Sequence, residues 1–186
     1  MNITTNEIRR IGETHKIEFK KSLSLRKEAL EALCGMINTD NAKGEVLFGV
    51  EPDGTICGIE SGNLDSAQKS LVLHIHQKFE PQIICNIEIL ECEGKLLILL
   101  KAERNAKIPY HEYDGRAYIR EGSSRRQLSY EEKRQLSVKR DRDRHNGPWK
   151  CNRCGAVVGM MFNMVITDQG VEKSYNCECG GEFWPI

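Results

Sequence analysis

Residues 44–50, GEVLFGV, form an apolar run of strand length that is bounded by glycines. Such a run favours a buried strand. Residues 51–54, EPDG, have the composition of a turn, and residues 55–59 can return as the second strand of a hairpin. Upstream, residues 26–38 place leucine, methionine and isoleucine on one face at helical spacing. The sequence therefore predicts a helix that is followed by a buried strand and a hairpin.

Further along the chain, the pattern predicts two more helices and three more strands. Residues 64–79 repeat apolar side chains at helical spacing and end before Pro81, and the last helix begins at Ser129. Hairpins mixed with separate helices are typical of an α+β fold, so we expect a mixed sheet with helices packed against it. The three strands are expected at residues 83–90, 95–102 and 115–120.

The composition limits the classes of function. The chain has 186 residues, of which 39% are hydrophobic, so it can bury the core of one domain and a small appendage. Its 27 Lys and Arg residues balance 27 Asp and Glu residues, so any nucleic-acid-binding surface is expected to be local. The longest aliphatic run, residues 96–100, is far shorter than the roughly 20 residues that cross a bilayer, and we expect no membrane span. The N-terminus lacks the apolar region of a secretory signal, which favours a cytoplasmic location.

Four of the eight cysteines lie in the last 36 residues, as the C-x2-C pair Cys151 and Cys154 and the C-x-C pair Cys177 and Cys179. Two such knuckles at hairpin tips bring four thiolates together, which is the closed tetrahedral arrangement of structural Zn²⁺. The pattern resembles a zinc ribbon, except that the second knuckle is shorter than the usual C-x2-C. A redox C-x2-C motif would need a βαβ context, which this segment does not have.

A turn-forming sequence, Asn146-Gly147-Pro148, separates these cysteines from the rest of the chain. We therefore expect two domains, residues 1–140 and residues 149–186, of which the second is a small β zinc ribbon. Because the second domain has little other apolar core, the metal is expected to supply most of its folding free energy.

The segment at residues 13–22, ETHKIEFKKS, places two carboxylates, Glu13 and Glu18, five positions apart around two alternating apolar residues. In a strand, Glu18 and Lys20 share the face opposite those apolar side chains. Taken alone, the pattern also fits a polar strand edge with solvated charges.

Three blocks together resemble the Schlafen/AlbA-type domain: IEFKKS at residues 17–22, INTDNAKGEVLFGVEPDGTICGIE at 37–60 and IPYHEYDGRAYIREGSSRRQLSYEE at 108–132. The resemblance covers residues of about 7 to 136. It implies an α+β fold and nucleic-acid binding. Some members of this family are endoribonucleases that cut tRNA and rRNA with three carboxylates and a divalent metal.

The resemblance implies that Glu13 and Glu18 are two of those carboxylates and that the third is Asp53 or, alternatively, Glu51. Mg²⁺ or Mn²⁺ would take these oxygen ligands and activate a water molecule, and Lys20 would stabilise the developing negative charge. The chain departs from the family in the loop before the buried strand, which has one glycine where the family usually has two. It also has no G-x4-G-K-[ST] motif, which argues against nucleotide hydrolysis despite the family's label as a divergent ATP-binding domain.

The family's Arg-x-Gly-Ser-Ser pattern is also present. Guanidinium groups, hydroxyls and the backbone amides of such a turn can hold phosphate together. The alternative is an exposed turn whose arginines pair with Glu131 or Glu132. The candidate nucleic-acid-binding residues are Arg120, Ser123, Ser124, Arg125 and Arg126.

We therefore expect a nucleic-acid-binding protein, with RNA favoured over DNA, and metal-dependent endoribonuclease activity as its enzymatic form. The alternatives are a non-catalytic nucleic-acid-binding or transcription-regulatory module, and a protein-interaction module that uses the zinc ribbon. Animal Schlafens carry the domain twice in tandem, whereas this chain carries it once, so a C2 homodimer is also expected.

Overall fold

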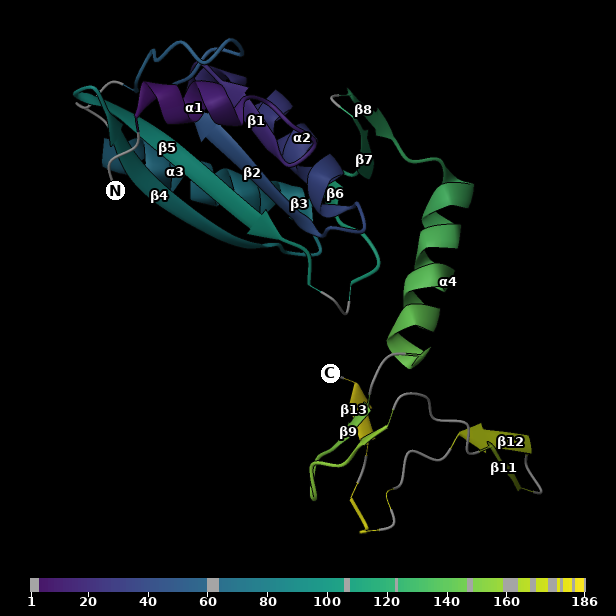
Figure 1. Ribbon diagram of the computed structural model, residues 1–186. Helices are drawn as coiled ribbons and strands as arrows, with labels where there is room; N and C mark the ends of the chain where they lie inside the picture. The colour runs from purple at the N-terminus through teal and green to yellow at the C-terminus, as the bar shows by residue number, and fades with distance from the viewer. Residues whose placement is uncertain are drawn as a thin grey trace. The chain divides into compact units, whose positions relative to one another are not determined.

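The computed structural model describes residues 4–59, 64–105, 108–122, 124–146, 149–158, 164–167, 170–173, 177, 179–181 and 183–185 (Figure 1). The chain forms two units, Met1–Lys133 and Arg134–Ile186. The predicted domain boundary between residues 140 and 149 stays a prediction, because Gly147 and Pro148 lie outside the described residues.

The larger unit is built on a four-stranded mixed sheet, which confirms the predicted α+β class. Its strand order is β1-β2-β5-β4, and β1 is parallel to β2 while the other pairs are antiparallel. The parallel pair requires a crossover, which the helix α2 (Arg26–Ile37) provides after a short 3-10 turn, η1 (Leu23–Leu25). The strands are β1 (Ile17–Lys20), β2 (Lys43–Phe48), β4 (Ile84–Cys92) and β5 (Lys95–Glu103).

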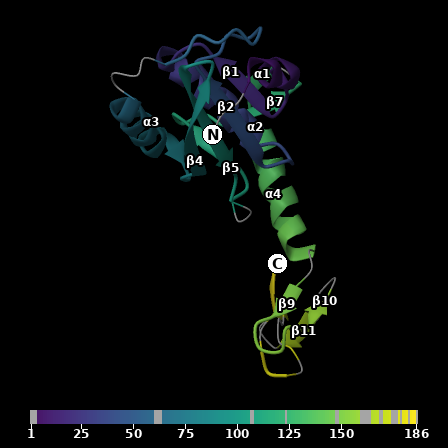
Figure 2. The same ribbon diagram turned by 60° about the vertical axis from the view of Figure 1, so that its left-hand side comes forward.

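Apolar side chains cover both faces of this sheet. On one face, α2 and α3 (Leu64–Lys78) pack against a core that contains Val46, Phe48 and Leu100. On the other face, Ile8 of the helix α1 (Thr5–Ile11) packs with Phe19 and other residues of the sheet. Figures 1 and 2 show α3 beside β4, at the edge of the sheet that is farthest from β1.

Two short antiparallel strand pairs complete this unit. The strand β3 (Phe79–Glu80) pairs with β6 (Glu112–Tyr113), and β7 (Tyr118–Glu121) pairs with β8 (Ser124–Gln127). The backbone of β7 lies directly on α2 at Gly35, where a Cβ atom would be 3.3 Å from both the carbonyl carbon of Ile119 and the amide nitrogen of Arg120. A larger residue at this position would therefore push the helix and this strand slightly apart.

One predicted strand is absent from the described chain. Residues 55–59 form only isolated bridges, Val50 with Ile56 and Ile59 with Leu96, instead of a continuous hairpin strand. Gly54 and Gly58 both have positive φ, 84° and 78°, so the backbone turns twice within this segment. The prediction of a returning strand was therefore wrong in detail, although the turn before it is present.

The smaller unit contains short strands. The helix α4 (Tyr130–Asn146) begins in the larger unit and ends in the smaller one, and Ser129 and Glu132 cap its start reciprocally. Within the described residues, no helix combines the length and the apolar character that a bilayer crossing needs. The strands form a sheet of order β10-β9-β13 and a separate β11-β12 pair: β9 (Trp149–Cys151), β10 (Val157–Val158), β11 (Met164–Thr167), β12 (Gly170–Lys173) and β13 (Phe183–Pro185).

Candidate metal centre and nucleic-acid interface

The four C-terminal cysteines lie together in the smaller unit, with all their sulfur atoms within 4.8 Å of one another. The Sγ atoms of Cys151 and Cys179 are 3.5 Å apart, and those of Cys154 and Cys177 are 3.7 Å apart. A tetrahedral ion with Zn–S bonds of about 2.3 Å requires S–S separations of about 3.8 Å. The donor set and its spacing therefore fit a zinc ion, and four thiolates leave no open position for a substrate.

Each pair of cysteines lies on a tight turn. The amide of Gly155 donates to the carbonyl of Cys151 at 3.1 Å, and the amide of Gly180 donates to the carbonyl of Cys177 at 2.8 Å. Backbone amides, first that of Cys154 and then that of Arg153, point toward the sulfur of Cys151 and lower the pKa of this thiol to about 6. Because the thiolate is the form that binds metal, these amides favour the metal-binding form of Cys151.

Glu18 in the larger unit is buried and carries two ion pairs. Only 8% of the residue is exposed, and its Oε2 atom accepts from Nη1 of Arg120 at 2.7 Å while its Oε1 atom accepts from Nζ of Lys20 at 2.6 Å. Burial alone would raise the pKa of Glu18, but the hydrogen bonds from Lys20 and Arg120 outweigh it and lower the pKa. For Glu18, the alternative of a solvated charge at a strand edge was therefore wrong, whereas Glu13 is exposed.

Arg120 connects β7 to the edge strand of the sheet. Its side chain is 2% exposed, and besides Glu18 it donates to the carbonyls of Thr14 at 3.0 Å and Gly122 at 3.2 Å. The sequence predicted a phosphate ligand at this position. The structure instead places the guanidinium inside the domain, where it holds the β7–β8 hairpin against β1.

The other candidate carboxylates have separate partners. Glu13 accepts from the backbone amide of Phe19 at 2.9 Å, next to Glu18, whereas Glu51 lies 3.9 Å from Lys21. Asp53 is exposed and accepts from the amide of Thr55 at 2.8 Å, which lowers its pKa. Within the described residues, the one close group of three or more metal-ligating side chains is the cysteine cluster. The structure therefore places the Glu13 carboxylate at the backbone of β1, at the residue that follows Glu18, and among the described residues it shows no cluster of three carboxylates there.

The arginines of β8 are exposed and paired. Arg125 contacts Glu31 of α2 at 2.8 Å, and Arg126 contacts both Glu121 at 2.8 Å and Glu132 at 2.7 Å. The predicted alternative, a pair between an arginine of this turn and Glu132, is confirmed. The hydrogen bond from Arg126, followed by those from Ser129, lowers the pKa of Glu132 to about 2.

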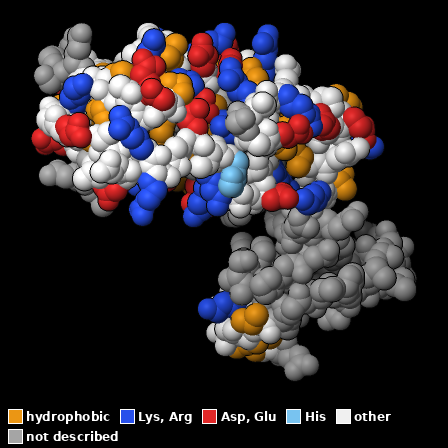
Figure 3. Space-filling model, turned by 45° about the horizontal axis from the view of Figure 1, so that its top comes forward, with side chains coloured by type: hydrophobic (Ala, Val, Ile, Leu, Met, Phe, Trp, Pro, Cys, Tyr) orange, Lys and Arg blue, Asp and Glu red, His pale blue; other side chains and the backbone are white. Residues whose placement is uncertain are grey.

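Of the two candidate serines, the described residues include only Ser124. Ser124 lies in β8, whose four residues are all exposed, and Ser123 lies outside the described residues. Figure 3 shows that acidic and basic side chains alternate over the visible face of the larger unit. This alternation agrees with the balanced charge of the sequence.

Sequence reasoning missed Asn38, which connects the end of α2 to the first strand of the β7–β8 hairpin. Asn38 is fully buried at the end of α2 and donates to the carbonyls of His111 at 2.8 Å and Tyr118 at 2.9 Å. Its Oδ1 atom accepts from the amide of His111 at 2.8 Å. The only signal in the sequence is a polar residue directly after an apolar helix.

A family model, described as Schlafen, AlbA_2, matches residues 13–129. This chain belongs to that family. The match agrees with the predicted resemblance, and it ends before the four C-terminal cysteines. The family suggests a function that involves nucleic acid.

A solved structure shows a similar fold for this Schlafen AlbA_2 domain. The crystal structure of the DIP2311 protein from Corynebacterium diphtheriae has a TM-score of 0.50 at 15% identity, and the match covers 73% of this chain and 26% of that protein. The chain thus spans about a quarter of that protein's length. The N-terminal domain of a RecG-related protein from Nitrosomonas europaea, solved by NMR, has a TM-score of 0.48 at 21% identity, with 67% of this chain and 90% of that one covered. A search of curated proteins finds no match.

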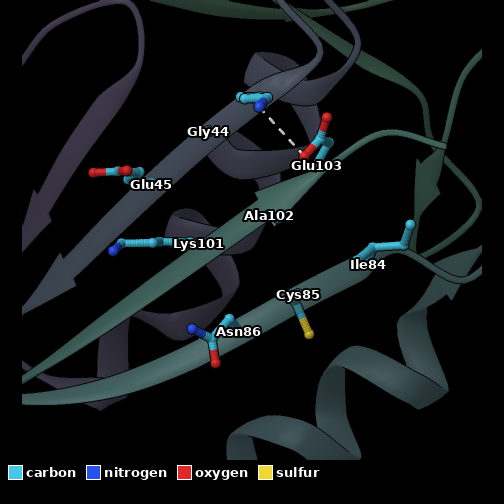
Figure 4. A pocket seen from close by; sticks show the side chains of 9 residues that line it. Gly44, Glu45, Ile84, Cys85, Asn86, Lys101, Ala102 and Glu103 are labelled. Atoms are coloured by element: carbon cyan, nitrogen blue, oxygen red, sulfur yellow. Dashed lines mark ion pairs between the residues drawn. The ribbon is translucent and has the colours of Figure 1, made fainter. Parts of the chain in front are cut away.

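The Schlafen AlbA_2 domain also has two shallow pockets on the part of the sheet that α1 leaves open. Each has a volume of about 340 Å³, and they share the start of β2, at residues 43–45. In Figure 4, Glu45, Lys101 and Asn86 extend from three neighbouring strands, and Lys43 forms an ion pair with Glu103 at 3.5 Å. Their mixed charge favours neither a polyanion nor a cation.

Proposed function

We propose that this protein binds nucleic acid, RNA in preference to DNA, through the β7–β8 hairpin, and that Glu18 has a structural role. The observation that supports this proposal is the position of the three arginines. Arg120 is buried against Glu18 and fixes the hairpin, whereas Arg125 and Arg126 extend from the exposed strand β8. One guanidinium thus anchors the surface that the other two present.

The existing partners of Arg125 and Arg126 do not prevent phosphate binding. The side chain of Arg125 is 32% exposed and that of Arg126 is 44% exposed, and surface ion pairs contribute only about 0–1 kcal/mol each. A phosphate can accept two parallel hydrogen bonds from a guanidinium, and its binding releases counterions from the nucleic acid. Exchange of a carboxylate for a phosphate is therefore energetically accessible at both arginines.

RNA is the favoured ligand because of the family resemblance, in which some members act on tRNA and rRNA. Metal-dependent cleavage is the second candidate, and the observation that favours it is the hydrogen bond from the Phe19 amide to Glu13, which holds this carboxylate at the backbone next to residue 18. Glu13 and Glu18 both offer the hard oxygen ligands that Mg²⁺ or Mn²⁺ prefers. However, Glu18 would have to break its ion pairs with Lys20 and Arg120 to bind a metal. Binding without cleavage is therefore the better-supported proposal.

The proposal is tested by measuring affinity for a labelled RNA hairpin, a single-stranded DNA and a duplex DNA at several salt concentrations. We expect the wild type to bind the RNA most tightly. Replacing both Arg125 and Arg126 with alanine should weaken binding and reduce the salt slope by about 0.7–0.9 for each phosphate contact that is lost. The matched control replaces Arg9 and Arg10, an adjacent exposed pair on α1, and should leave the slope unchanged.

The same samples are incubated with Mn²⁺ or with EDTA and examined for cleavage. Metal-dependent cutting that is lost in Glu13→Gln would favour the endoribonuclease over a binding module. An equal loss of affinity in both arginine double variants would place the interface elsewhere. Absence of any nucleic-acid binding would leave the protein-interaction alternative.

A further inference from the structure

The two edges of the central sheet are finished differently. At the β1 edge, the strand has only four residues, the carboxylate of Glu13 accepts the amide of Phe19, and Arg120 donates to the carbonyl of Thr14. These side chains occupy backbone groups that another strand would otherwise use. The β1 edge is therefore blocked by its own domain.

The β4 edge has no such protection within the described chain. This strand has nine residues, it pairs only with β5, and no described strand lies on its outer side (Figure 1). Its sequence, ICNIEILEC, contains no proline and no lysine, which are the residues that commonly prevent pairing at an edge. A long edge strand without these features is a template for another strand.

Apolar residues near this edge are also exposed. Ile84 at the start of β4 is 61% exposed, and Val72 of α3 is 39% exposed. Val72 is two residues from His74, which corresponds to about 200° around the helix. The ring of His74 hydrogen-bonds to Tyr113 on the side of α3 that faces the core, so Val72 lies on the opposite side of the helix. Ile84, which is part of β4 itself, would lie beside a second β4 that joined the sheet.

The sequence of β4 is complementary to itself in one antiparallel register. When Ile87 faces Ile87 of the second copy, Asn86 lies opposite Glu88 and Ile84 lies opposite Leu90. Within one chain, Oε1 of Glu88 already accepts from Asn86 at 3.0 Å and from Lys101 at 2.9 Å, so the Asn86 of the second copy would bond to the other oxygen of Glu88. Centring the pairing on Glu88 instead would place two carboxylates directly opposite each other, which is unfavourable. We propose that the protein forms a C2 homodimer by antiparallel pairing of β4 with β4 of a second copy, centred on Ile87, to give a continuous eight-stranded sheet.

The register makes opposite predictions for two substitutions at one exposed position. Asn86→Glu places a carboxylate opposite Glu88 twice in the dimer, and we expect the dissociation constant to rise about tenfold. Asn86→Lys places an ammonium group opposite Glu88 twice, so the dissociation constant should fall severalfold. The control Ser70→Glu adds the same charge to the exposed face of α3 and should leave the dissociation constant within about twofold.

The measurement is sedimentation velocity of the full chain with zinc bound, from about 1 to about 100 µM. A dimer that weakens in Asn86→Glu and strengthens in Asn86→Lys supports the pairing. Circular dichroism of each variant verifies that the monomer is folded. A monomer throughout the concentration range overturns the proposal, and so does a dimer whose dissociation constant is the same in both Asn86 variants, because its contact would lie elsewhere.

Discussion

Replacing Glu18 with alanine should destabilise the larger unit by about 3 kcal/mol, because it leaves the buried guanidinium of Arg120 without its carboxylate. Removing one partner of a buried ion pair typically costs about 3–5 kcal/mol. The lower end of this range applies here, since Arg120 keeps its hydrogen bonds to the carbonyls of Thr14 and Gly122. With a urea dependence of about 2 kcal/mol per molar, the unfolding midpoint should fall by about 1.5 M.

The control for this experiment is Glu121→Ala, which removes one partner of the exposed Arg126. This variant should lose no more than about 1 kcal/mol. Replacing the buried pair together, Glu18→Leu with Arg120→Met, should recover much of the stability, since the charge is then no longer left alone. A Glu18→Ala midpoint that matches the wild type would refute the assignment of a buried ion pair.

Three further outcomes are expected. Hydrogen bonds hold the pKa of Glu18 in the folded state below its ordinary value of 4.5. The ion pairs of Glu18 therefore stabilise the fold above about pH 4.5, and this stabilisation is lost as the pH falls through the lowered pKa. Urea titrations of Glu18→Gln should show a weaker acid dependence than those of the wild type. One zinc ion per chain should copurify with the protein. The variant Cys177→Ser should lose this ion and unfold the ribbon while the larger unit stays folded. Elemental analysis and circular dichroism test this prediction, and protein without zinc would contradict it. Asn38→Ala removes three hydrogen bonds to buried backbone groups of His111 and Tyr118 and should cost about 2–3 kcal/mol in the same urea assay, whereas an unchanged midpoint would show that water replaces the amide.

The elements that sequence patterns predicted are the ones that bury a periodic face. The helices α2 and α3 and the strands β2, β4 and β5 each have enough apolar positions to reveal their period. The helix α1 buries only Ile8, so its period is invisible, although Thr4 and Glu7 form a capping box that marks its start. The two-residue strands β3 and β6 are too short for any pattern to detect.

The candidate sites also differ in how well the sequence predicts them. The cysteine centre could be predicted because the spacing within each knuckle is local, and the structure brings the four sulfur atoms together. The pair between Glu18 and Arg120 joins residues that are 102 positions apart, so neither residue type nor local spacing identifies it. For the same reason, the sequence assigned both residues to solvent-facing chemistry, whereas the fold buries them.

The contacts that hold the β7–β8 hairpin have a consequence for how the chain folds. Asn38 bonds to groups 73 and 80 positions away, and Glu18 bonds to Arg120 over 102 positions, whereas the hairpin of β4 and β5 closes over only a few residues. The entropy of closing such long loops must be overcome before their contacts become favourable, and contacts at long sequence separation slow folding. We therefore expect β4 and β5 to pair early and the β7–β8 hairpin to dock late. A nascent chain can complete this docking only after residue 120 has left the ribosome.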